Sequence, residues 1–133
     1  MTDIYGELQS LSENSSILIV DDSDEIVNSL IELFKMFFKE VDCASDGKEG
    51  FEKATSNKFN IIISDLEMPN MNGIEMITKI KEVHPNQRII ALSGYIDKHV
   101  DELTKLNVDA YMEKPYYVIK LFEDIIECLK KDS

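Results

Sequence analysis

The sequence has few basic residues. There are 14 lysines and arginines against 26 aspartates and glutamates, so the 133-residue chain has a formal net charge of −12 at pH 7. A chain this acidic repels phosphate backbones and anionic lipid. We therefore expect no direct nucleic acid binding and no attachment to a membrane. The excess of carboxylates fits a divalent-cation site or a basic partner, and it equally serves solubility alone.

Cysteine is scarce, and no targeting or membrane-spanning segment is visible. Cys43 and Cys128 form no CxxC pair, so neither a zinc site nor a redox motif is indicated. The first residues lack the basic and apolar regions of a signal peptide. No apolar run approaches the length of a transmembrane helix. We expect a cytoplasmic protein whose cysteines are reduced.

The chain contains no internal repeat, linker or low-complexity tract, and its length predicts one domain. From Ser16 onward, apolar runs alternate with segments of helical periodicity. We expect strands at residues 17–20, 41–44, 59–64, 88–92 and 108–112. We expect helices at 24–39, after Asp46-Gly47, after Asn72-Gly73, at 97–106 and at 118–129.

This alternation predicts the fold class. Strands that are apolar throughout are covered on both faces, and strand–helix–strand units with short loops form parallel sheets with right-handed crossovers. We expect an α/β fold over residues 16–131, with a doubly wound five-stranded parallel sheet and five helices. Residues 1–15 are an N-terminal extension, either a loose tail or an extra helix with Ile4, Leu8 and Leu11 on one face.

Polar side chains follow four of the five predicted strands. They are Asp21 and Asp22, Asp65, Ser93, and Lys114. In an open parallel sheet, ligands bind beyond the carboxyl ends of the strands. The second strand ends without such a residue. If it is an edge strand, the first and third strands are neighbours and Asp22 lies beside Asp65.

Three carboxylates in one pocket must share protons, shift their pKa values or bind a cation. An oxygen-only cluster without histidine or cysteine selects a hard ion, and Mg²⁺ is the expected one. Mg²⁺ commonly binds one or two carboxylates together with a substrate phosphate, so the site suits a phosphoryl group. Lys114 adds a cation, Ser93 adds a hydroxyl donor, and a carboxylate can become an aspartyl phosphate.

The ordered segments 17–22, 44–50, 63–73, 90–94 and 109–115 resemble the receiver domain of two-component response regulators. The likeness is to single-domain, chemotaxis-regulator-like members. It implies a flavodoxin-like sheet of strand order 2-1-3-4-5. It also implies that Asp65 is the phosphoacceptor. Mg²⁺ is expected on Asp65, on Asp22 directly, on Asp21 through water and on the backbone carbonyl of Glu67.

The same resemblance assigns the activation switch. Ser93 would bond a phosphoryl oxygen and swing inward, and Lys114 would pair with the phosphoryl group. Tyr111 would be the rotameric aromatic that follows Ser93, the alternative being a plain core residue. The Lys114–Pro115 bond is expected to be cis, the isomer that costs least at proline.

Two further residues are expected to affect the rate at which water removes the phosphoryl group. Glu67 places a carboxylate near the phosphoryl group, and Tyr95 is bulky enough to shield the acyl phosphate from water. The two histidines, His84 and His99, have no partner that the sequence reveals, and we expect both at the surface.

The helix at 24–39, with Ile26, Leu30, Leu33 and Phe37 inward, is more apolar than one buried face requires. In the receiver family this helix docks on the kinase or phosphotransfer partner, which would use the excess. Residues 1–15 covering it, or simply a wide core-facing stripe, are the alternatives.

The leading hypothesis is a phosphorylation-driven switch that is not a turnover enzyme. Its phosphodonor would be a histidine kinase or phosphotransfer protein. Its output would be a downstream protein or a missing output domain, and a weak homodimer is compatible. Four alternatives remain: an Mg²⁺-dependent aspartyl phosphohydrolase, a fragment of a longer regulator or hybrid kinase, a receiver that no longer accepts phosphate, and a flavodoxin-like cofactor binder. Residues 21–25 hold four carboxylates, which would repel a flavin phosphate.

Overall fold

Five parallel strands form the sheet in the computed structural model, which describes residues 3–131. The strands are β1 (Ser16–Val20), β2 (Glu40–Ala44), β3 (Ile61–Asp65), β4 (Ile89–Ser93) and β5 (Ala110–Glu113). They lie in the order β2-β1-β3-β4-β5, and every neighbouring pair is parallel. The predicted flavodoxin-like order is confirmed. β2 is an edge strand, so β1 and β3 are neighbours.

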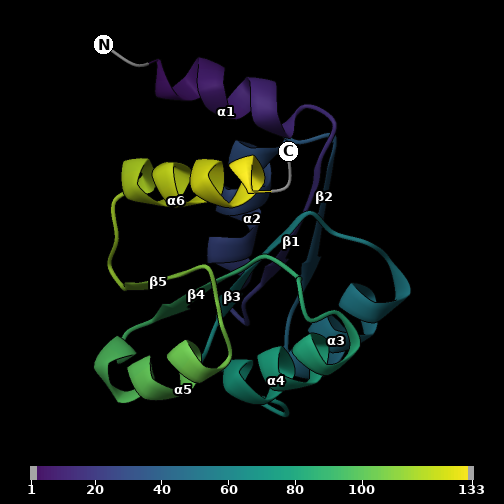
Figure 1. Ribbon diagram of the computed structural model, residues 1–133, viewed down its shortest axis with the longest axis vertical. Coiled ribbons are helices and arrows are strands. Elements are labelled where there is room, and N and C mark those ends of the chain that lie inside the picture. The colour runs from purple at the N-terminus through teal and green to yellow at the C-terminus, as the bar shows by residue number, and fades with distance from the viewer. Residues whose placement is uncertain (1–2, 132–133) are drawn as a thin grey trace.

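Helices cover both faces of this sheet (Figure 1). They are α1 (Ile4–Ser12), α2 (Asp24–Phe34), α3 (Gly47–Ser56), α4 (Gly73–Val83), the 3₁₀ helix η1 (Ile96–Lys98), α5 (Val100–Lys105) and α6 (Val118–Lys130). α1, α2 and α6 lie on one side, and α3, α4 and α5 lie on the other. No helix within residues 3–131 is both long and apolar enough to cross a membrane.

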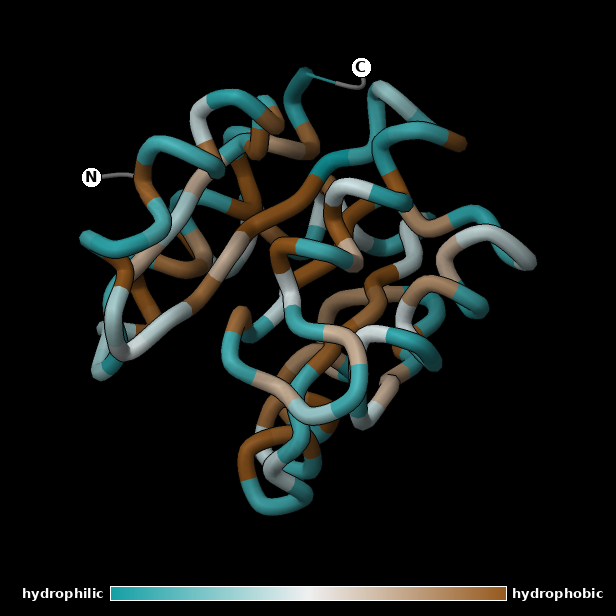
Figure 2. The backbone as a smooth tube through the Cα atoms, turned by 90° about the horizontal axis from the view of Figure 1, so that it is seen from below, coloured by the Kyte–Doolittle hydropathy of each residue, from teal (hydrophilic) through white to brown (hydrophobic). Residues whose placement is uncertain are grey.

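The burial pattern along the strands explains the two helical layers. In β1, Ile17 and Ile19 pack into the cluster that holds α2 and α6, whereas Leu18 and Val20 pack into the cluster that holds α3 and α4. β1, β3 and β4 are buried at every position. In Figure 2 the brown, hydrophobic stretches run through the interior of the molecule. The residues at the carboxyl ends of the central strands are therefore attached to strands that are covered on both faces.

Loops at that edge enter the next helix through side-chain caps. Ser23, Asp46 and Asn72 each accept a hydrogen bond from the backbone N–H three residues further along. Such caps satisfy donors that the first helical turn leaves unpaired. Gly73, the first residue of α4, lies so close to the carbonyl oxygen of Asp65 that a Cβ atom would overlap it. The start of α4 is thus packed directly against the end of β3.

The predicted helix at 24–39 is too long at its C-terminal end. α2 ends at Phe34, and the backbone N–H of Phe37 donates to the Phe34 carbonyl oxygen (3.0 Å) in a tighter turn. Phe37 and Phe38 are nevertheless buried in the core. Because these two apolar residues follow the helix directly, the sequence pattern resembled one continuous helix, although they are buried by a turn.

The buried face of α2 also differs from the predicted one. Ile26 is 38% exposed, whereas Val27, Leu30 and Phe34 are buried. Val27, rather than Ile26, packs with Leu30 and Phe34 into the core cluster on this side of the sheet.

The predicted helix at 97–106 is divided into η1 and the six-residue α5. Asn107 then adopts the left-handed conformation (φ 55°), and β5 begins at Ala110 rather than at 108. The backbone N–H of Asp109 still donates to the Ile89 carbonyl oxygen (3.0 Å). His99 falls between the two short helices.

Residues 4–12 form the extra helix α1, which packs on α6 and on the turn that follows α2. Leu8 is fully buried, and the Tyr5 ring lies against Phe37 (centroids 6.5 Å apart) and edge-on to Phe122 (5.9 Å). The buried Ser12 hydroxyl lies 2.9 Å from the Phe37 carbonyl oxygen. α1 therefore covers the Phe37 part of the apolar excess noted in the sequence, whereas Met36 and Ile26 remain exposed.

Candidate functional site

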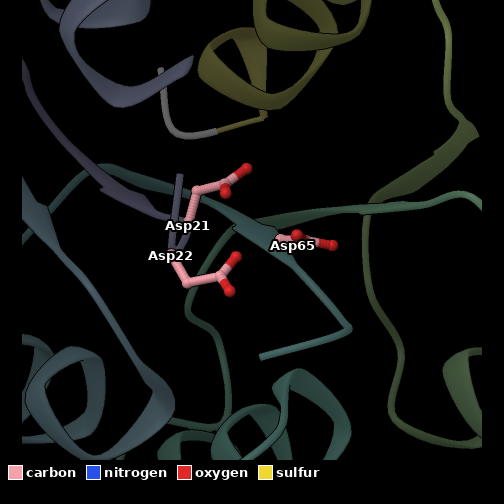
Figure 3. Close-up of side chains that lie close together, drawn as sticks. All are labelled: Asp21, Asp22 and Asp65. Carbon is pink, nitrogen blue, oxygen red and sulfur yellow. The ribbon is translucent and has the colours of Figure 1, made fainter. Parts of the chain in front are cut away.

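Three carboxylates gather at the carboxyl ends of β1 and β3 (Figure 3). Asp21 and Asp22 directly follow β1, and Asp65 is the last residue of β3. One ligand oxygen from each lies within 4.8 Å of the other two. Asp21 and Asp65 are buried, and Asp22 is exposed. The pocket therefore has two fixed carboxylates at its base and one at its mouth.

Lys114 reaches this pocket from the loop after β5. Its Nζ lies 3.1 Å from Oδ2 of Asp65 and 3.4 Å from Oδ2 of Asp21. Its backbone N–H donates to the Ser93 carbonyl oxygen (2.9 Å), and the Lys114–Pro115 peptide bond is cis. The pocket thus carries one fixed ammonium against three carboxylates.

The protonation balance of the pocket follows from burial and charge. Burial raises the pKa of the Asp65 carboxyl, and the charge of Asp21 adds to this, although the hydrogen bond and charge of Lys114 act the other way. Burial alone would lower the pKa of Lys114, but its bond to Asp65 and the charge of Asp21 outweigh burial and raise it. The charge of Asp21 contributes to both shifts, because the carboxylates outnumber the cations. An added cation would relieve the imbalance.

The donor set fits Mg²⁺. All three groups are carboxylates, and hard divalent cations prefer oxygen ligands. Asp21 is already oriented, because its Oδ1 accepts from the backbone N–H of Ser23 (2.9 Å). Asp65 Oδ1 accepts from the backbone N–H of Glu67 (3.3 Å). Asp22 at the mouth is exposed, so its carboxylate is accessible to solvent.

Ser93, the last residue of β4, is fully buried and does not face open solvent. Its hydroxyl lies 2.9 and 2.8 Å from the two carboxylate oxygens of Glu67. The same oxygen accepts from the backbone N–H of Tyr95 (2.8 Å). Glu67 is therefore in direct contact with Ser93, a contact that sequence analysis did not foresee.

The prediction that both histidines are plain surface residues is wrong for His99. Its side chain is only 22% exposed, and Nε2 lies 3.1 Å from Oε2 of Glu67. His84 is exposed, as expected. The sequence carried no signal for the contact between His99 and Glu67. The loops that hold these residues are brought together only because β3 and β4 pair in the sheet.

The two tyrosines near these loops stand at the surface. The Tyr111 residue is 42% exposed, so it is not a core residue, and it lies opposite Ala91 of β4. Tyr95 is 60% exposed, and Lys98 Nζ lies 5.0 Å from the centroid of its ring.

The sheet order and the acidic pocket define a receiver domain. The chain belongs to the response regulator receiver domain family, whose profile matches residues 17–126. It is 33% identical over 124 residues to the Bacillus subtilis transcriptional regulatory protein YesN, covering 88% of this chain and 34% of that protein. It is 32% identical over 120 residues to response regulator ArlR of Staphylococcus haemolyticus, covering 88% and 53%. The chain thus spans about a third to a half of these relatives.

Two solved structures match over nearly their whole length. Response regulator protein TrrA of Thermotoga maritima, in complex with Mg²⁺-BeF, aligns with a TM-score of 0.76 and 30% identity, covering 86% of this chain and 98% of that chain. A CheY-like receiver domain protein of Methanospirillum hungatei aligns with a TM-score of 0.81 and 28% identity, covering 91% and 100%.

Membership confirms the class of function expected from the sequence. The chain is a phosphoaccepting response regulator receiver with an acidic pocket at Asp21, Asp22 and Asp65, and such a triad is the Mg²⁺ site of receivers. The family consists of signalling domains rather than turnover enzymes, and receiver domains interact with histidine kinases.

Proposed function

We propose that Asp65 accepts the phosphoryl group and that a histidine kinase or phosphotransfer protein donates it. One observation carries the assignment: Asp65 is the pocket carboxylate that lies closest to the Lys114 ammonium, at 3.1 Å. It also ends a central strand, so its position is set by the most buried part of the sheet. Asp22 and Asp21 serve as metal ligands rather than as acceptors.

The chemistry is an in-line transfer to a carboxylate oxygen. An oxygen of Asp65 attacks phosphorus, the P–N bond to the donor imidazole breaks, and its electron pair stays on the ring nitrogen. Bound Mg²⁺ would supply positive charge that neutralises the phosphoryl oxygens. Asp22, Asp65 and the backbone carbonyl of Glu67 would hold the ion directly, and Asp21 would hold it through water. Lys114 balances the charge of a second phosphoryl oxygen.

Ser93 and Tyr111 carry the switch. The Ser93 hydroxyl turns toward a phosphoryl oxygen and donates to it. The Tyr111 ring, 42% exposed on the adjacent strand, moves inward when Ser93 has turned. The exposed ring supports this role, because a residue that is already packed inside has no such movement to make.

The output is a contact with another protein or with an output domain of the same protein. YesN and ArlR are named as regulators and are two to three times as long as the matched segment. The donor kinase and the target are cytoplasmic partners, direct nucleic acid binding by this acidic domain is not part of the function, and a weak homodimer is one form the contact can take.

The test is the intact mass of the protein after incubation with acetyl phosphate and Mg²⁺. Wild type should gain one phosphoryl group, and Asp65→Asn should gain none. Asp97→Asn, which changes an exposed aspartate of η1, should behave as wild type. An adduct on Asp65→Asn would place the acceptor on another residue.

A further inference from the structure

A chain of hydrogen bonds runs from Ser93 to a histidine outside the acidic pocket. The Ser93 hydroxyl lies 2.9 and 2.8 Å from the oxygens of Glu67, and Oε2 of Glu67 lies 3.1 Å from Nε2 of His99. The three residues come from the loop after β3, from the end of β4 and from the junction of η1 with α5. None of the aspartates is part of this chain.

In this arrangement the Ser93 hydroxyl already donates its one hydrogen bond. A hydroxyl has one hydrogen to donate, and here that hydrogen goes to the Glu67 carboxylate. The oxygen also accepts from the backbone N–H of Tyr95. Because Ser93 is fully buried, bulk water does not accept a hydrogen bond from its hydroxyl. The hydroxyl must leave Glu67 before it can donate to a phosphoryl oxygen.

His99 fixes the carboxylate to which Ser93 is bound. A carboxylate is only an acceptor, so Nε2 of His99 carries the hydrogen of the contact. Within residues 3–131, Nδ1 of His99 is buried without a hydrogen-bond partner. The ring therefore has one productive orientation. The Glu67 side chain is 39% exposed and would otherwise have water as an alternative partner.

We infer that Glu67 and His99 are positioning residues that hold the Ser93 hydroxyl away from the phosphoryl site. Glu67 competes with the incoming phosphoryl group for the single hydrogen of Ser93, and His99 orients Glu67 for that competition. The inference rests on the proposed function, since it assigns Ser93 as a phosphoryl ligand. It makes the η1–α5 segment part of the control of phosphorylation.

His99 separates this mechanism from two others. Charge repulsion between Glu67 and a phosphoryl group would act without any histidine. A nucleophilic serine would need the histidine on its own hydroxyl, whereas His99 contacts Glu67. Only the competition mechanism makes the phosphorylation rate depend on His99 through Ser93.

The first experiment needs no phosphorylation. The chain has two histidines, so ¹⁵N-detected NMR of the rings at pH 8 gives two sets of signals. His99 should appear as the single tautomer with hydrogen on Nε2, and exposed His84 should average between tautomers. Glu67→Gln should release His99 toward the averaged pattern. A His99 ring that averages like His84 in wild type would overturn the inference.

The second experiment measures the rate of phosphorylation by acetyl phosphate with Mg²⁺. His99→Ala should raise the rate about three- to tenfold, the scale of one ordinary net hydrogen bond. His99→Gln retains an N–H donor and should stay near wild type, and so should His84→Ala. In a Ser93→Ala background, His99→Ala should have no further effect.

An unchanged or slower rate in His99→Ala would overturn the inference, as would an undiminished effect in the Ser93→Ala background. Failure of the proposed function looks different. It would appear as phosphorylation of Asp65→Asn, or as a wild type that takes up no phosphoryl group from any donor. In that case the histidine spectrum still shows whether His99 is bonded to Glu67, so the failure of the proposed function is distinguished from the absence of this contact.

Discussion

The Lys114 ammonium lies 3.1 Å from a carboxylate oxygen of Asp65, although Asp65 ends β3, Lys114 follows β5, and β4 lies between these two strands. Lys114 must therefore reach across the end of β4, where its backbone N–H is bonded to the Ser93 carbonyl oxygen. This backbone hydrogen bond ties the position of Lys114 to the end of β4, so the ammonium is held beside Asp65 by the sheet itself.

Lys114→Met should slow phosphorylation by acetyl phosphate by about tenfold to a hundredfold, because a preorganised cation is lost where negative charge accumulates. Lys114→Arg should retain part of the rate. Lys120→Met removes an exposed lysine that pairs with Asp124 on α6 and should match wild type. The measurement is an intact-mass time course. A Lys114→Met rate equal to wild type would remove the ammonium from the proposed mechanism.

Asp65→Asn should be more stable than wild type at neutral pH in the absence of divalent ions. Burial raises the pKa of the Asp65 carboxyl above its ordinary value of 3.8, so the folded state binds this proton more tightly than the unfolded state does. Stability therefore falls as the pH rises from that ordinary value through the raised pKa. The advantage of Asp65→Asn should be largest at pH 7 and should shrink toward about pH 4.

Thermal unfolding across this pH range tests the prediction, with Asp97→Asn as the matched control. A shift of the melting temperature by a few degrees is expected for a change of about 1 kcal/mol in a domain of this size. If Asp65→Asn melted below wild type at pH 7, the pocket would be stabilised by its charges rather than strained by them.

Leu8→Ala should lower the free energy of unfolding by about 3 kcal/mol, the usual cost of truncating a fully buried leucine. The side chain belongs to the cluster shared by α1, α2 and α6. Urea unfolding gives the value, and Gln9→Ala on the exposed side of α1 is the control. A loss below about 0.5 kcal/mol, the scale of surface substitutions, would mean that α1 is not packed as described.

Cys128 should resist alkylation in the folded protein. Burial, with a smaller contribution from the charge of Asp109, raises the pKa of its thiol to about 12, so almost no thiolate is present at pH 8. Iodoacetamide should add one group to native protein, at the partly exposed Cys43, and two groups after unfolding. Peptide mapping identifies the site, and Cys43→Ser should leave native protein unlabelled. Rapid labelling of that variant would contradict the burial of Cys128.

Tyr95→Ala should shorten the lifetime of the acyl phosphate severalfold if the ring excludes water from it. The ring stands 60% exposed beside Lys98. Loss of phosphoryl group after removal of the donor is followed by intact mass. Tyr117→Ala, which removes an even more exposed ring before α6, is the control. An unchanged lifetime in Tyr95→Ala would end the shielding hypothesis.

The sequence was sufficient for the fold and for the acidic pocket because both depend on local signals. Each central strand is an apolar run that stops at a polar residue. The second strand ends without one, which is compatible with an edge position, and the resemblance to receiver domains supplied the strand order that places Asp22 beside Asp65. The structure brings them together with Asp21.

The contacts of His99 could not be predicted in the same way. Glu67 and His99 lie in different loops, and no periodicity relates them. The end of α2 was also misjudged, since Phe37 and Phe38 are buried by a turn rather than by a helix face. Such features depend on how loops pack after the sheet has formed.

The full burial of β1 and β3 has a further consequence. Asp21 and Asp65 are attached to backbone that cannot move apart, so the repulsion between their carboxylates is retained in the folded state. A cation that enters the pocket releases this retained repulsion and stabilises the fold by linkage. Substitutions that let the two strand ends separate would then make the empty protein more stable and bind the ion more weakly. The rigid sheet therefore raises the affinity for the ion and, by the same repulsion, lowers the stability of the protein without the ion.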